Sequence, residues 1–153
     1  MLQNENSGNP HGRRRPNEAP EYDRIMVEYC TGEQSLLGQA TSSSRGCKIV
    51  RITEKINALS SEGHALALRE ATRKSPSSPP VLLWASLPCT GGSPWYNINV
   101  RKPGGWKRLK DHRALFKKLW AKFFIVCEEC LASSGDTCIE WPTGCAYWKC
   151  KIF

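Results

Sequence analysis

The chain has 153 residues, 40% of them hydrophobic and six of them tryptophan, which suits one compact domain with a substantial core. Its formal net charge of +8 and pI near 9.2 favour an anionic partner, nucleic acid first, although solubility alone would also explain the charge. The sequence has no run of about 18 apolar residues, which argues against a membrane-spanning helix, and its polar N-terminus lacks the apolar segment of a signal peptide.

Eight cysteines are an even number, so a secreted disulfide scaffold has to be considered. Because no signal peptide is visible, we instead expect reduced thiols in a soluble intracellular protein, with the compartment left open. Residues 1–22 are rich in Asn, Gly, Pro and Arg and offer almost nothing to bury. We therefore expect a disordered basic tail over 1–22 and a single domain over 23–153.

Apolar patterning predicts strands and helices in alternation along the chain. We expect strands over 24–30, 47–53, 81–86 and 136–141, with helices starting at Ser35 as a cap, over 61–73 and over 111–133. Residues 94–110 are expected to form a long loop or a partly ordered segment. This order predicts an α/β domain with a mainly parallel sheet, flanking helices and right-handed crossovers.

The longest of the expected helices, over 111–133, has the clearest apolar stripe. The stripe consists of Leu115, Leu119, Phe123, Val126 and Cys130. We expect these side chains to face the core. Cys127 and Cys130, with Cys145 and Cys150 further on, have a spacing loosely like that of a zinc site. Since the first two fall inside this helix, we expect buried thiols and no metal.

Polar residues follow three of the predicted strands. An acid and a glycine, Glu28 and Gly32, lie where the first strand ends, although neither a phosphate-binding loop nor a GxGxxG motif is present. Glu54 ends the second strand, where a carboxylate can accept hydrogen bonds from a ribose diol. The alternative for Glu54 is an ordinary surface acid beside Lys55.

The third strand, which begins VLLW, is expected to be buried on both faces and is followed by Pro88-Cys89 and a Gly91-Gly92 turn. Such a turn would expose the thiol and let a ligand approach the backbone. A silent cysteine in an ordinary loop is the alternative. Glu140, near the end of the last strand, would neighbour Cys89 in a doubly wound sheet and could supply a proton to a ligand there.

Together these residues resemble the amino-terminal half of the cytosine-5 DNA methyltransferase family, which has the class I S-adenosylmethionine-dependent fold. Glu28 to Ser35 is similar to D-L-F-x-G-x-G-G only in the acid and the first glycine. Glu54 to Asn57, a glutamate with an asparagine three residues later, is similar to E-x-D/N, and Pro88 to Ser93 resembles P-C-Q-x-x-S. Glu140 matches the glutamate of E-N-V. The resemblance covers residues 24–142 and implies a reduced, Rossmann-like domain.

The resemblance also implies a covalent mechanism. Cys89 would add to carbon 6 of a flipped-out cytosine, Glu140 would contact ring nitrogen 3, and S-adenosylmethionine would methylate carbon 5. Cofactor contacts would come from Glu28, Gly32, Glu54, Ser86 and Pro88. DNA, favoured over RNA, would meet a basic segment interleaved with aromatic residues, namely Arg101, Lys102, Lys107, Arg108 and Lys110. A solvated basic loop is the alternative for that segment.

The sequence also departs from the family. Gln34 and Ser35 replace glycines of the first motif, and Trp141-Pro142 replaces the Asn-Val beside the glutamate. The family's later motifs and target-recognition region have no counterpart, so a partner chain could supply them. Two other hypotheses stay open: an inactive nucleic-acid-binding relic of the fold, and a methyltransferase acting on another acceptor.

Overall fold

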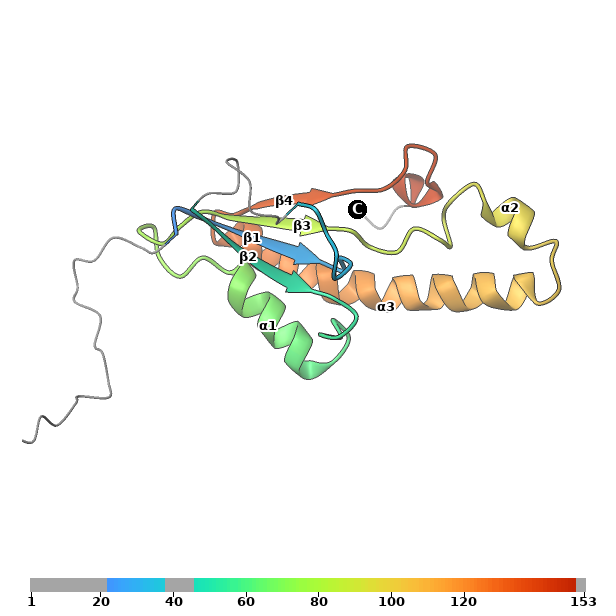
Figure 1. Cartoon of the computed structure of the whole chain (residues 1–153), viewed down its shortest axis with the longest axis horizontal. Helices are drawn as coiled ribbons and strands as arrows, with labels where there is room; N and C mark the ends of the chain where they lie inside the picture. Colours follow the sequence, from blue (N-terminus) through green and yellow to red (C-terminus); the bar gives the residue numbers. More distant parts are fainter. Residues whose placement is uncertain (1–21, 38–45, 151–153) are drawn as a thin grey trace, which may run out of the picture.

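The structure is a computed structural model that describes residues 22–37 and 46–150 (Figure 1). One four-stranded sheet contains β1 (Arg24–Tyr29), β2 (Cys47–Ile52), β3 (Val81–Ala85) and β4 (Asp136–Ile139). All neighbouring strands are parallel, in the order β2-β1-β3-β4. The predicted parallel α/β sheet is confirmed, with each strand one or two residues shorter than expected. The expected tail lies outside the described residues except for Tyr22.

The strand order creates a switch point between β1 and β3. The chain passes from β1 to β2 on one side and then crosses back to β3 and β4 on the other. The two crossovers toward β4 run through α1 (Ser61–Ala71) and α3 (Gly105–Ala132). These helices pack against each other below the sheet in Figure 1, as expected when both crossovers have the same hand. In such sheets a ligand binds beyond the carboxyl ends of the strands at the switch point.

The core lies between the sheet and these two helices. Val27 and Tyr29 from β1 are completely buried there, and the Tyr29 ring lies 5.4 Å from the ring of Phe123 on α3. Along β3, buried residues alternate with half-buried ones. We expected β3 to be buried on both faces. Among the described residues, it is fully buried only on the face that packs against α1 and α3.

Residues 94–110, expected to be a long loop or a partly ordered segment, are largely helical. It contains the short helix α2 (Tyr96–Asn99), and α3 begins at Gly105 instead of residue 111. Gly104 precedes α3 with a φ of 70°, a left-handed conformation that favours glycine. The Pro103-Gly104 turn therefore starts a helix directly. We call α2, residues 100–104 and the first turns of α3 up to residue 113 the basic arm; it extends beyond the sheet in Figure 1.

The core-facing stripe of α3 is rotated from the expected one at its N-terminal end. Leu115 is 41% exposed, whereas Phe116 and Trp120 are buried. The reason is a 3-10 helix, η2 (Ala146–Lys149), that packs on α3: the Tyr147 ring stacks on Phe116 with centroids 3.8 Å apart. Leu119, Phe123, Val126 and Cys130 are buried as predicted.

No helix begins at Ser35. Residues 36 and 37 are a bend and a turn, and the Ser35 hydroxyl donates a 3.0 Å hydrogen bond to the Glu28 carboxylate instead of capping a helix. The remainder of that predicted helix lies outside the described residues.

Candidate functional site

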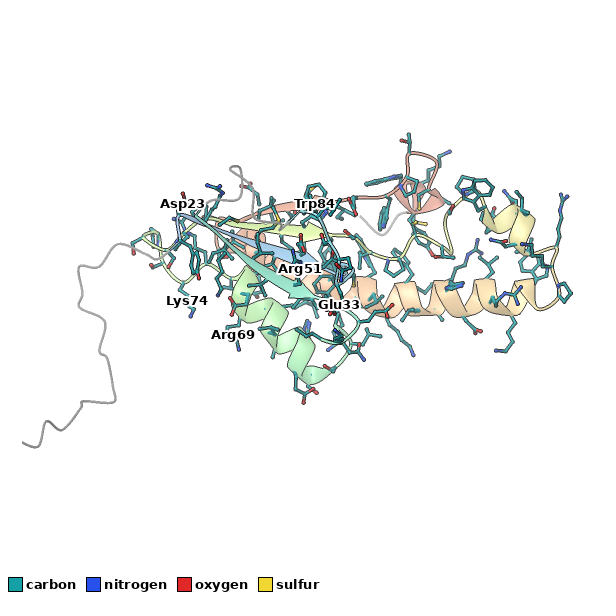
Figure 2. The ribbon with its side chains drawn as sticks, viewed as in Figure 1. Asp23, Glu33, Arg51, Arg69, Lys74 and Trp84 are labelled. Carbon is teal, nitrogen blue, oxygen red and sulfur yellow. The ribbon has the colours of Figure 1, made fainter. Side chains whose placement is uncertain are left out.

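Two cavities adjoin each other at the carboxyl end of the sheet. The first, which we call the acidic cavity, has a volume of about 520 Å³. Segments following β1 and β2 form most of it, with Pro88 and two leucines of α3 closing it. Among the described residues that line it, the charged ones are Glu33 and Glu54. In Figure 2, Glu33 lies at the arrow end of the sheet, opposite the end that carries Asp23.

The two acids of this cavity are held differently. Glu33 accepts a hydrogen bond from the Thr53 hydroxyl and another, of 3.2 Å, from the Lys55 ammonium. The Thr53 bond, followed by the Lys55 bond, keeps the pKa of Glu33 below its ordinary value. Glu54 is exposed and makes no hydrogen bond or ion pair with any described residue. Its carboxylate is therefore available to a ligand.

The second cavity, which we call the Cys89 cleft, has a volume of about 490 Å³. The segment following β3 forms one wall and the segment following β4 the other. Its lining residues are Ser86, Leu87, Pro88, Cys89, Thr90, Glu140, Trp141 and Pro142. Pro88 lines the acidic cavity as well, so the two cavities share a wall. The structure thus brings the predicted pair Cys89 and Glu140 into one cleft.

Hydrogen bonds beyond the sheet fix Glu140 in the cleft. Its backbone N–H donates to the Ala85 carbonyl (3.0 Å), which extends the pairing of β3 with β4 by one residue. The Ser86 hydroxyl donates to the Glu140 carboxylate (2.7 Å), and the Trp141 indole N–H donates to the Leu87 carbonyl (3.0 Å). The two walls of the cleft are therefore tied together.

Cys89 lies on a tight turn that η2 supports from behind. The N–H groups of Gly92 and Ser93 both donate to the Cys89 carbonyl, at 2.9 and 2.8 Å. A Cβ atom on Gly91 would meet the Tyr147 hydroxyl, and one on Gly92 would lie 2.9 Å from the Tyr147 ring. We expected these glycines to let a ligand approach the backbone of the turn. Instead, it is the Tyr147 side chain that lies close to their backbone.

The predicted cofactor residues fall into three groups. Gly32, Glu54 and Pro88 line the acidic cavity, whereas Ser86 lines the Cys89 cleft. Glu28 lines neither cavity, because its side chain is completely buried on the opposite face of the sheet from the helices. There it forms a 2.7 Å ion pair with Arg51, its neighbour on β2. Glu28 is therefore a structural residue of the sheet.

The predicted nucleic-acid residues are all exposed on the basic arm: Arg101, Lys102, Lys107, Arg108 and Lys110. They do not form one cluster. Lys107 lies 3.3 Å from Asp111 in an ion pair, whereas Lys102 and Arg108 line a third cavity.

Three contributors were not predicted from the sequence. Arg113 donates through Nε to the Gly91 carbonyl (3.0 Å) and lies 5.4 Å from the centre of the Tyr96 ring, which links the basic arm to the Cys89 turn. Tyr147 packs against that turn. Neither position carries a sequence signal, because each depends on tertiary packing. Glu33 did carry a sequence signal, because it is an acid directly after Gly32.

All eight cysteines lie within the described residues, and all are free thiols. Within residues 22–37 and 46–150, no group of three or more His, Cys, Asp or Glu side chains is arranged to hold a metal ion. In the same residues, no helix has the length and apolar character needed to cross a membrane.

Comparisons with known proteins identify no relative of the chain. No protein-family model, no curated protein and no solved structure matches the chain. What the two cavities bind must therefore be inferred from their own residues.

Proposed function

We propose that the chain is an S-adenosylmethionine-dependent methyltransferase-type domain that methylates carbon 5 of cytosine in a nucleic acid, with Cys89 as nucleophile. One observation carries the proposal. Cys89 and Glu140, which are distant in the sequence, line one cleft that shares Pro88 with the acidic cavity at the switch point of a parallel sheet.

The acidic cavity suits this cofactor. S-adenosylmethionine carries a sulfonium and an ammonium group, and the charged side chains among the described lining residues are both acids, in a chain of net charge +8. Apolar walls from Ile52, Leu59 and Leu119 suit an adenine ring. When bound, the cofactor supplies an electrophilic methyl group.

Two further features complete the fit. The Glu54 carboxylate, which pairs with no described residue, can accept hydrogen bonds from both hydroxyls of a ribose. Gln34 and Ser35, which replace family glycines, do not line the cavity, so their side chains leave it open.

The residues of the Cys89 cleft would act on the base. The Cys89 sulfur forms a bond to carbon 6, and the ring electrons move toward carbon 5. A proton or hydrogen bond from Glu140 to ring nitrogen 3 stabilises that charge. Carbon 5 takes the methyl group, whose sulfonium donor leaves as a neutral thioether. The carbon 5 proton then passes to a solvent base, any proton on ring nitrogen 3 returns to Glu140, the bond to sulfur breaks, and the Cys89 thiolate is released. In a duplex the base must first leave the stack.

Equilibrium dialysis with radiolabelled S-adenosylmethionine tests the cofactor assignment. We expect Glu54→Gln to weaken binding about tenfold or more, because a hydrogen bond to a charged group contributes about 1.5–3 kcal/mol. Glu62→Gln is the matched control, since Glu62 is an exposed acid on α1 that does not line the cavity. No binding to the intact protein, or equal weakening by both substitutions, would contradict the assignment.

A further inference from the structure

A third cavity lies in the basic arm, between α2 and the first turns of α3. It has a volume of about 310 Å³. Its polar lining side chains are Thr90, Tyr96, Asn99, Lys102, Arg108 and His112. No acid is present among the described residues that line it. The cavity therefore combines positive charge with several hydrogen-bond donors.

The positive charge of this cavity is not neutralised within the described part of the protein. Residues 95–118 contain eight lysines and arginines against a single acid, Asp111, which pairs with Lys107. Lys102 and Arg108 are exposed, and neither side chain makes a hydrogen bond or ion pair with any described residue. Two uncompensated cations at one hollow favour an anion, and arginine in particular suits the oxygens of a phosphate.

The cavity is joined to the Cys89 cleft. Thr90, the residue that follows Cys89, lines both. Arg113 connects the same two regions, because it contacts Tyr96 of α2 and the carbonyl of Gly91. An anion held in the arm would therefore lie beside a base in the Cys89 cleft.

We propose that this cavity binds a backbone phosphate of the nucleic-acid strand whose cytosine reaches Cys89, an inference that rests on the proposed function. Lys102 and Arg108 supply the charge, and Asn99, His112 and Thr90 supply hydrogen bonds. Two exposed aromatic residues, one directly before the arm and one within it, favour a strand over free phosphate. Trp95 and Trp106 are 70% and 63% exposed and offer ring faces on which bases can stack.

Fluorescence anisotropy with a labelled single-stranded oligothymidylate, over a series of salt concentrations, tests the site. We expect Lys102→Ala/Arg108→Ala to weaken binding at least tenfold, and to reduce the slope of log K against log salt by about 0.7 for each phosphate that the variant no longer neutralises. Lys117→Ala/Lys118→Ala is the matched control: it removes the same charge from exposed positions of α3 that do not line the cavity. We expect it to weaken binding less than about threefold.

Equal weakening by the two pairs would overturn the site in favour of diffuse charge. Displacement of the strand by inorganic phosphate at constant ionic strength would overturn the assignment to a strand phosphate. The probe contains no cytosine and needs no cofactor, so the outcome is independent of catalysis. If strand binding depends on Lys102 and Arg108 but Cys89 forms no adduct with a cytosine, the proposed function is wrong and the phosphate site is still supported.

Discussion

The hydroxyl of Ser86 donates a 2.7 Å hydrogen bond to the carboxylate of Glu140. The two residues follow β3 and β4 directly, and the register that pairs Ala85 with Ile139 brings them side by side. Glu140 is exposed, so this bond holds an acid that would otherwise sample several rotamers. One carboxylate oxygen is thereby fixed, and the other is left for a ligand in the Cys89 cleft.

If the chain is the proposed methyltransferase, replacing Glu140 should reduce methyl transfer more than replacing Ser86. We expect Glu140→Gln to lower the single-turnover rate about 100-fold, which is typical of losing a general acid. Ser86→Ala should lower it about tenfold, because the acid remains but loses its orientation. Single-turnover assays at saturating concentrations of both substrates compare the two variants with the unchanged protein. An unchanged rate in Ser86→Ala would contradict the positioning role.

The pair formed by Glu28 and Arg51 should be important for stability. Arg51→Met leaves the completely buried Glu28 carboxylate without its partner, and we expect a loss of about 3 kcal/mol in the free energy of unfolding. Arg69→Met removes an arginine from an exposed pair with Glu70 and should cost less than about 1 kcal/mol. Urea denaturation measures both. Similar losses for the two variants would contradict a buried, structural role for Glu28.

Gly91 should tolerate no side chain. A Cβ atom there meets the Tyr147 hydroxyl and lies 2.9 Å from Cγ of Arg113, so we expect Gly91→Ala to destabilise the protein by about 1–3 kcal/mol. Gly32→Ala is the control, because no atom lies within 4 Å of the Cβ it would add. Thermal unfolding followed by circular dichroism compares the two. Equal melting temperatures would show that Tyr147 does not pack against the Cys89 turn.

The free energy of unfolding should fall in alkaline solution because the buried Cys30 thiol resists ionisation in the folded state. Burial raises the pKa of its thiol from 9.0 to about 12. The folded state then keeps a proton that the unfolded state releases, so the stabilisation is complete below about pH 9 and is lost as the pH rises toward about 12. Cys30→Ala should remove a dependence of up to about 1.4 kcal/mol per pH unit. Urea denaturation at about pH 8 and about pH 10 measures the free energy of unfolding of the unchanged protein and of Cys30→Ala. An equal loss of that free energy in the two proteins between these pH values would contradict the prediction.

Much of the fold could be predicted because the strands of this sheet have distinct apolar segments bounded by Gly, Pro and Ser. The start of α3 could not, because Pro103-Gly104-Gly105 is typical of a loop and the first buried apolar side chain of the helix is that of Leu109. Leu115 was misplaced for a related reason. The face of α3 at that point is decided by contacts with Trp141 and Tyr147, which no local pattern encodes.

The site could be predicted where it depends on the ends of parallel strands. Glu54, Cys89 and Glu140 each follow a strand, and parallel strands end at one edge of the sheet. Glu28 was misjudged because side chains alternate along a strand, and its position points away from the cavities. The resemblance of Glu28 to the acid of the family's first motif does not indicate on which face of the sheet its side chain lies.

The covalent step proposed at Cys89 is tested most directly with DNA that contains 5-fluorocytosine. Fluorine at carbon 5 cannot leave as a proton does, so the bond from the Cys89 sulfur to carbon 6 persists after methyl transfer. With S-adenosylmethionine present, denaturing electrophoresis and mass spectrometry should detect a protein–DNA adduct with the intact protein and none with Cys89→Ala. An adduct that survives the substitution, or none with a folded protein that binds both ligands, would contradict the mechanism.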